Sequence, residues 1–179
     1  MTTRRAGLVT DEGAPRTLVG TPIAVGDAAP DFCCRVHDPE TWALDPFGLA
    51  DTPVGTVRVF SVVPSLDTPV CALQTTRFDA DVAAMGRAVA AYTVSVDTPY
   101  AMHRFCRAQA VSTLVNLSDY RPERSCGHAW GVLAEETGEL VRAVFVVDRD
   151  GRVALEEIVP EIADEPHYDA ALAAIRAVL

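Results

Sequence analysis

Residues 57–71 read VRVFSVVPSLDTPVC, and this stretch decides how the middle of the chain folds. The β-branched and aromatic residues of 57–63 predict a buried strand. The Ala-rich segment that begins at residue 72 predicts a helix. The turn-forming residues between them, which include Pro64 and Pro69, join the two elements and deliver Cys71 to the start of the helix.

The predicted position of Cys71 gives its sulfur a physical reason to be reactive. In the first turn of a helix the backbone N–H groups lack partners, and the helix dipole is positive there. Both effects favour a thiolate over a thiol, and the thiolate is the nucleophilic form of cysteine. We therefore predict that Cys71 is a reactive cysteine, with a buried structural thiol as the alternative.

Length and charge exclude several classes of protein. The chain has 179 residues, which suits one domain with a substantial core, and a formal net charge of −10. That charge argues against nucleic acid and against an anionic membrane surface as partners. All 15 basic residues are arginine, so no lysine is present to form a Schiff base or to act as a nucleophile.

Cysteine usage indicates a reducing environment. Five cysteines form no CxxC pair, and their odd number argues against a disulfide-stapled secreted scaffold. The pair Cys126 and His128 has metal-compatible chemistry but no further ligand nearby in sequence, so we expect neither a metal nor an organic cofactor. Residues 1–20 lack the apolar segment of a signal peptide, and no run reaches membrane-spanning length. We expect a cytoplasmic protein.

The predicted elements alternate between strand and helix through most of the chain. Strands are predicted at residues 57–63, 92–96, 114–117, 143–148 and 152–159, and helices at 70–91, 98–110 and 168–179. We expect a single domain over 17–179 after a loose N-terminal leader at 1–16, with a β-hairpin over 17–25 that turns at Gly20. This order predicts an α/β fold, a thioredoxin-like sandwich with a central mixed sheet flanked by helices and an added N-terminal β-hairpin.

Pro64, Thr68 and Cys71 stand at the spacing P-x-x-x-T-x-x-C, and each residue type suits a reactive thiol. Proline fixes the backbone and shields a thiolate from water. A hydroxyl three residues before the cysteine can accept a hydrogen bond from a peroxide while donating one to the sulfur. In a strand–turn–helix setting this motif resembles that of the peroxiredoxins. The longer run over 61–71 is similar to the thiol peroxidases, their atypical two-cysteine branch.

The resemblance extends over most of the chain. Residues 20–32 resemble the segment with which the family's domain begins. Residues 95–106 are similar to the segment that carries the family's resolving cysteine. Arg142 stands directly before the predicted strand at 143–148, where the family keeps an active-site arginine.

These matches imply a role for each matched residue. Cys71 becomes the peroxidatic nucleophile, and Cys106 the resolving cysteine that forms an intrachain disulfide with it. Thr68 and Arg142 become the groups that orient the peroxide and hold the thiolate. The implied enzyme is a thiol-dependent peroxidase that reduces hydrogen peroxide and organic hydroperoxides to water or alcohol. Members of the family are homodimers that thioredoxin reduces.

The two cysteines are expected on different helices. If both helices are intact in the reduced protein, the two sulfurs lie too far apart to bond. The sequence therefore predicts a reduced and an oxidised conformer that differ over 66–74 and 98–110.

Other interpretations remain open at this stage. Cys106 could be a helix residue packed in the core, and Arg142 could be a solvated surface arginine. Cys33, Cys34 and Cys126 are additional to the active pair, and the first two are expected at a strand end. A competing function is a non-enzymatic peroxide-sensing redox switch that uses the same two cysteines.

The remaining imidazole and indole side chains suggest no chemistry by themselves. His37, His103 and His167 are expected to be scattered over the surface. Trp42 and Trp130 are expected to be packing residues, because large aromatic side chains dominate protein cores.

Overall fold

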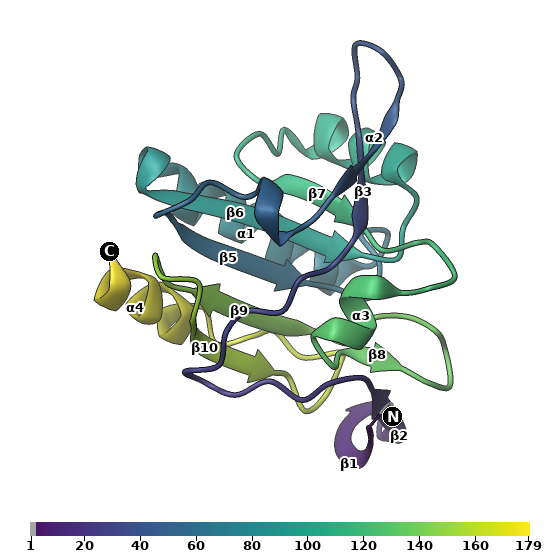
Figure 1. Cartoon of the computed structure of the whole chain (residues 1–179). Coiled ribbons are helices and arrows are strands. Elements are labelled where there is room, and N and C mark those ends of the chain that lie inside the picture. Colours follow the sequence, from purple (N-terminus) through teal and green to yellow (C-terminus); the bar gives the residue numbers. More distant parts are fainter. Residues whose placement is uncertain (1–2) are drawn as a thin grey trace.

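A computed structural model of the chain describes residues 3–179, and a seven-stranded mixed sheet runs through its centre (Figure 1). The strands lie in the order β10-β9-β5-β6-β7-β3-β4. They are β3 (Cys34–His37), β4 (Leu44–Phe47), β5 (Val57–Val62), β6 (Val89–Ser95), β7 (Val115–Ser118), β9 (Ala143–Val147) and β10 (Val153–Ile158). The expected thioredoxin-like α/β architecture with a mixed sheet is confirmed.

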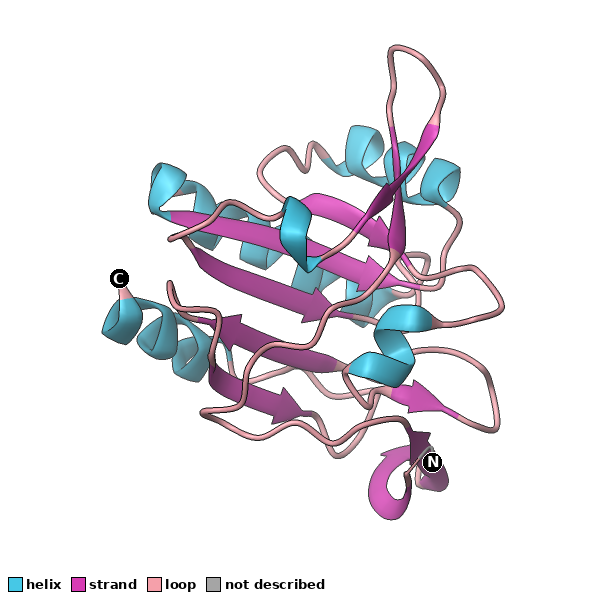
Figure 2. Ribbon diagram, viewed as in Figure 1, coloured by secondary structure: helices cyan, strands magenta, loops and turns pink. Residues whose placement is uncertain are grey.

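Parallel strands at the centre of the sheet are joined by helices. Strands β5, β6 and β7 are parallel, and β9 runs antiparallel to β5. The helices are α1 (Pro69–Ala83), α2 (Pro99–Gln109), α3 (Ser125–Ala129) and α4 (Tyr168–Val178). Because α1 follows β5 and α2 follows β6, each parallel pair has the helical crossover that it needs (Figure 2).

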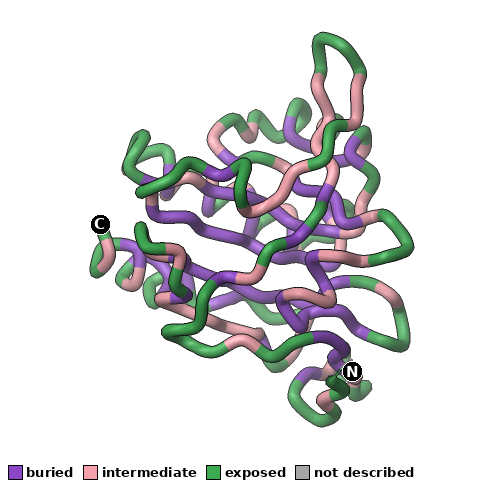
Figure 3. Tube along the Cα trace, in the orientation of Figure 1, coloured by how far each residue is buried: buried purple, intermediate pink, exposed green. Residues whose placement is uncertain are grey.

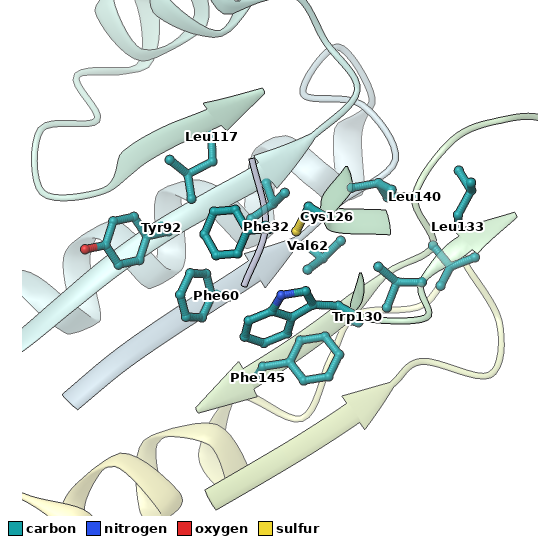
Figure 4. Close-up of a cluster of buried hydrophobic side chains, with 14 of the residues drawn as sticks. Phe32, Phe60, Val62, Tyr92, Leu117, Cys126, Trp130, Leu133, Leu140 and Phe145 are labelled. Atoms are coloured by element: carbon teal, nitrogen blue, oxygen red, sulfur yellow. The ribbon is translucent and has the colours of Figure 1, made fainter. Parts of the chain in front are cut away.

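The two faces of the sheet bury different cores, because side chains alternate along each strand. On one face Trp130 lies between Phe60 and Phe145, with ring centroids 4.8 Å from each (Figure 4). The segment over 20–33 and helix α3 cover this face. On the other face α1 and α4 pack together through Phe78 and Tyr168. The central strands are buried on both faces (Figure 3).

The N-terminal hairpin exists, but it lies earlier than predicted. Strand β1 (Arg4–Asp11) pairs with β2 (Ala14–Val19), so the expected loose leader over 1–16 is wrong for the described residues, and residues 1–2 lie outside them. The chain turns at Gly13, whose φ of +79° suits a tight hairpin turn.

Gly20, the predicted turning point, has a different task. A Cβ atom at this position would lie 2.3 Å from the carbonyl oxygen of His128, so only glycine allows the backbone to pass α3 so closely. Strand β2 continues the hairpin into a second small sheet by pairing with β8 (Leu133–Ala134). The predicted range of the hairpin and its predicted turning point are therefore both wrong, because β2 pairs with the distant strand β8.

Two other predicted boundaries also shift. The helix expected over 70–91 ends at Ala83, because Val89 and the residues after it pair with β5 as part of β6. Strand β4, which pairs with β3, is absent from the predicted elements. The helix expected over 98–110 is confirmed as α2, with the Thr98 hydroxyl accepting from the N–H of Ala101. None of the helices within residues 3–179 is long and apolar enough to cross a membrane.

Candidate active site

Cys71 lies in the first turn of α1, as the sequence predicts. Thr68 is the N-cap residue of the helix, Pro69 opens it, and the Cys71 side chain is fully buried. The turn before the helix is held by Asp97, which follows β6. One Asp97 oxygen accepts from the Ser65 hydroxyl at 2.7 Å, and the other accepts from the Leu66 N–H at 2.7 Å. The two turns at the carboxyl ends of β5 and β6 are thus tied to each other.

The pairing of β5 with β9 brings Arg142 to the turn that carries Cys71. Val62 near the end of β5 pairs with Ala143 at the start of β9. Arg142 directly precedes Ala143, so its side chain reaches the turn that carries Cys71. Its Nη2 atom donates to the Cys71 sulfur at 3.4 Å. Arg142 is only 2% exposed, which excludes the interpretation of a surface arginine.

The guanidinium of Arg142 is fixed by two further bonds. Its Nη1 atom donates to Oε1 of Gln74 at 2.7 Å, and its Nε atom donates to the carbonyl oxygen of Ile162 at 2.9 Å. Both of these acceptors are neutral. None of the ion pairs within residues 3–179 involves Arg142. A buried cation is costly unless an anion offsets it, and the sulfur that Arg142 contacts becomes an anion on deprotonation.

Gln74 is a site residue that the sequence analysis missed. It is fully buried, and its Nε2 atom donates to the Ser61 hydroxyl at 2.8 Å. The signal for it was present: Gln74 stands three residues after Cys71, on the same face of α1 as buried Phe78. A polar side chain on the buried face of a helix indicates a specific partner.

Pro64, Thr68 and Arg142 line one cavity of about 360 Å³. Cys71 is not among its lining residues and is linked to it through the bond from Arg142 to its sulfur. The predicted residues of the peroxide site are therefore brought together. One detail differs from the expectation. The Thr68 hydroxyl donates its proton to the carbonyl oxygen of Ser65 at 3.0 Å, so it does not donate to the sulfur.

The N-terminal hairpin contributes the rim of this cavity through Asp11, Glu12 and Arg16. Glu161 holds the hairpin there. Its carboxylate accepts from the N–H of Ala163, the hydroxyl of Thr10 and the N–H groups of the hairpin turn, and these bonds lower the pKa of Glu161 to about 2. Glu161 is therefore ionised at neutral pH, when it can accept all of these bonds.

Cys106 lies on the buried side of α2 as a free thiol. It belongs to the same small apolar cluster as Cys71, with Leu66, Met102 and Phe105 among its members. Burial raises the pKa of Cys106, and a hydrogen bond of 3.0 Å from the Asn116 amide to the sulfur acts in the opposite direction. Its position suits either a packed core residue or a thiol that is released when α2 opens.

The other three cysteines lie away from this cavity. Cys33 is exposed and Cys34 begins β3, so the expected strand end is confirmed. Cys34 and Cys126 are both buried in the aromatic core. A hydrogen bond between their thiols, together with burial, raises the pKa of Cys126 well above its ordinary value.

Known proteins resemble this chain over nearly its whole length. A family model described as Redoxin matches residues 24–172. The chain is 40% identical over 171 residues to a thiol peroxidase of Bacillus subtilis, covering 96% of this chain and 98% of that protein. It is 42% identical over 168 residues to a thiol peroxidase of Staphylococcus aureus, covering 94% of this chain and 97% of that protein.

Solved structures show the same similarity. A peroxiredoxin-like protein from Aquifex aeolicus superposes with a TM-score of 0.83 at 35% identity, covering 97% of this chain and 99% of that one. A thiol peroxidase from Chromobacterium violaceum shares the fold, with a TM-score of 0.80 at 18% identity over 94% of this chain and 95% of that one.

The contact between Arg142 and the Cys71 sulfur predicts a specific loss on substitution. Arg142→Lys keeps the positive charge but cannot reach Cys71, Gln74 and Ile162 together. We expect the rate constant for reaction with hydrogen peroxide to fall about 10²–10³-fold, the usual effect of removing one charge-stabilising donor. Single-turnover stopped-flow measurement of peroxide consumption tests this.

Arg58→Lys provides the matched control. Arg58 is also a buried arginine of this sheet, and its Nη2 atom donates to the carbonyl oxygen of Asp148 at 2.7 Å, away from the cavity. Equal rates for the two variants, with similar losses of stability, would mean that Arg142 serves only packing.

Proposed function

The chain belongs to the thiol peroxidases of the redoxin family and is a thiol-dependent peroxidase, and we propose that Cys71 is the sulfur that reduces the peroxide. The observation that carries this assignment is the bond from the buried Arg142 guanidinium to the Cys71 sulfur. A cation without a carboxylate partner stabilises the thiolate and, next to it, negative charge that develops on a peroxide oxygen.

In the first proposed step the Cys71 thiolate attacks the terminal oxygen of the peroxide. The S–O bond forms as the O–O bond breaks, and the leaving oxygen takes up a proton to depart as water or an alcohol. The sulfur loses two electrons and becomes a sulfenic acid. Both hydrogen peroxide and organic hydroperoxides react in this way.

Ionisation of the thiol supplies only part of the catalysis. An ordinary free thiol is about 3% ionised at neutral pH, so complete ionisation gains roughly 30-fold. Enzymes accelerate reactions by about 10⁶-fold or more. The larger share must come from placing the peroxide in line and stabilising the charge that moves onto its leaving oxygen.

Four side chains at or beside the cavity suit these tasks. Arg142 donates toward the reacting atoms, and Gln74 fixes its orientation. Because the Thr68 proton is engaged by Ser65, the Thr68 oxygen is left to accept the O–H of the peroxide. Pro64 is buried at the cavity wall, where it keeps water from the sulfur. We assign Thr68 and Arg142 to peroxide binding on these grounds.

In the second proposed step Cys106 resolves the sulfenic acid. Its thiolate attacks the Cys71 sulfur, the S–O bond breaks, water leaves, and an intrachain disulfide remains. Both cysteines are buried within intact helices, and burial disfavours the Cys106 thiolate. We therefore assign local unwinding over 66–74 and 98–110 to this step, which exposes Cys106 and lets the two sulfurs meet.

The finer biological setting is part of the proposal. We assign thioredoxin as the reductant of the disulfide, a homodimer as the assembly and the reducing cytoplasm as the location, following the family resemblance. A non-enzymatic peroxide sensor is not favoured, because relatives at 40% and 42% identity over nearly the full length are thiol peroxidases.

Substitution of each cysteine separates the two steps. We expect Cys71→Ser to consume no peroxide above background. Cys106→Ser should reduce one equivalent of peroxide and then stop, with turnover restored by a small thiol, because only the resolving step is lost. Peroxide consumption with a thioredoxin system measures both. Cys33→Ser is the control and should keep full turnover, whereas substantial turnover by Cys71→Ser would overturn the assignment.

The proposed unwinding predicts a change in backbone protection. Amides within 66–74 and 98–110 should exchange hydrogen faster in the oxidised protein than in the reduced one, since their helical hydrogen bonds are broken. Hydrogen exchange of both redox forms measures this, with the central strand β9 as the internal reference. Equal protection of both segments in the two forms would show that the disulfide forms without opening the helices.

A further inference from the structure

A patch of aromatic and basic side chains lies over α2, outside the cavity next to Cys71. We call it the aromatic–basic patch. It consists of His37, Trp42, Tyr100, His103, Arg104 and Arg107, and these residues border an open hollow of about 980 Å³. The loop between β3 and β4 supplies Trp42 and stands out beyond the sheet above α2 (Figures 1 and 2).

The rings of the patch contact one another in a fixed arrangement. The His37 ring lies 5.1 Å from Trp42, 5.2 Å from Tyr100 and 4.8 Å from His103, measured between centroids. Trp42 is 66% exposed and Tyr100 is 47% exposed. The expectation of a packed Trp42 is therefore wrong, and so is that of scattered histidines for His37 and His103, because the hairpin between β3 and β4 folds onto α2. His167 is exposed and lies apart from them, as expected.

Backbone strain holds Trp42 in solvent. Its φ of +59° lies in the left-handed region, which a bulky residue rarely adopts. Asp38 maintains this conformation: its carbonyl accepts from the Trp42 N–H at 2.8 Å, and its carboxylate accepts from the Thr41 hydroxyl at 2.6 Å. A strained, well-braced loop that exposes an indole indicates a binding role more than a packing role.

The patch covers the outer face of the helix that carries Cys106. Its α2 members share one face of the helix because they stand at the spacing i, i+3, i+4 and i+7: Tyr100, His103, Arg104 and Arg107. Met102, Phe105 and Cys106 form the opposite, buried face. A molecule bound to the patch would therefore lie against the segment that carries Cys106.

We propose that the aromatic–basic patch docks the protein dithiol that reduces the Cys71–Cys106 disulfide, an inference that rests on the proposed function. Exposed aromatic and arginine side chains are the types that dominate binding energy at protein interfaces. The patch carries two arginines on a chain of net charge −10, and of the ion pairs within residues 3–179 it takes part in one, between Arg104 and the exposed Asp67 at 3.7 Å. The matching partner carries its dithiol in an apolar face rimmed by acidic side chains.

Reduction of the Cys71–Cys106 disulfide by thiol–disulfide exchange needs no reductant besides the partner dithiol. One partner thiolate attacks the Cys106 sulfur, and Cys71 leaves as the thiolate beside Arg142. The second partner thiolate attacks the mixed disulfide, and Cys106 leaves in turn. The partner becomes a disulfide, and its two electrons and two protons restore both thiols of this chain.

A comparison of thioredoxin with dithiothreitol as the reductant distinguishes a loss of docking from a loss of catalysis. We expect Trp42→Ala and Arg107→Glu each to raise the KM for thioredoxin about tenfold or more, while turnover with dithiothreitol and single-turnover reaction with peroxide stay at the wild-type rate. Val54→Ala changes an exposed apolar residue elsewhere, and Arg149→Glu makes the same change of charge at another exposed position. Both controls should keep the wild-type KM.

Several results would overturn the docking proposal. An unchanged KM for thioredoxin in Trp42→Ala and Arg107→Glu would do so, as would equal losses with thioredoxin and dithiothreitol. Sedimentation that shows both variants losing a dimer present in the wild type would assign the patch to contact between two copies of the chain. Absence of any peroxide reaction by the wild type with dithiothreitol would instead refute the proposed function.

Discussion

The structure depends on one contact, the 3.4 Å bond from the guanidinium of Arg142 to the sulfur of Cys71. The cation is buried, and its other two acceptors are a neutral amide and a neutral carbonyl. Desolvating a charge in this way is unfavourable unless an anion lies beside it. The proposed reactive state, a thiolate at Cys71, would place an anion beside this buried arginine. The contact that the buried cation makes with the sulfur is therefore also the contact on which the proposed reaction depends.

The sheet makes this contact possible between residues far apart in the chain. The antiparallel pairing of β5 and β9 sets Ala143 opposite Val62, so the residue before one strand meets the turn after the other. Asp97 then fixes the turn that carries Cys71, and Glu161 fixes the hairpin at the rim of the cavity. The proposed peroxide site is thus assembled at the carboxyl ends of β5 and β6 from segments that the fold brings together.

Patterns of residue types over a few neighbouring positions predict most of the local secondary structure. The strand–turn–helix around Cys71 and the helix cap at Thr98 follow from residue types over a few positions. The N-terminal hairpin was misplaced because its register depends on pairing between β2 and β8, which lies more than a hundred residues away in sequence. The position of Arg142 follows only from the family resemblance, and its burial and its bond to Gln74 only from the structure, although the place of Gln74 on the buried face of α1 is a signal that the sequence carries. Trp42 was misjudged because its exposure results from a strained backbone that composition does not reveal.

The central claim is that positioning beside Arg142, and not exposure to solvent, decides which cysteine reacts. The most direct measurement treats Cys106→Ser with one equivalent of hydrogen peroxide in the presence of dimedone and maps the labelled cysteine by mass spectrometry. The account predicts the label on buried Cys71. Label on exposed Cys33, or an equal distribution over the remaining cysteines, would contradict it.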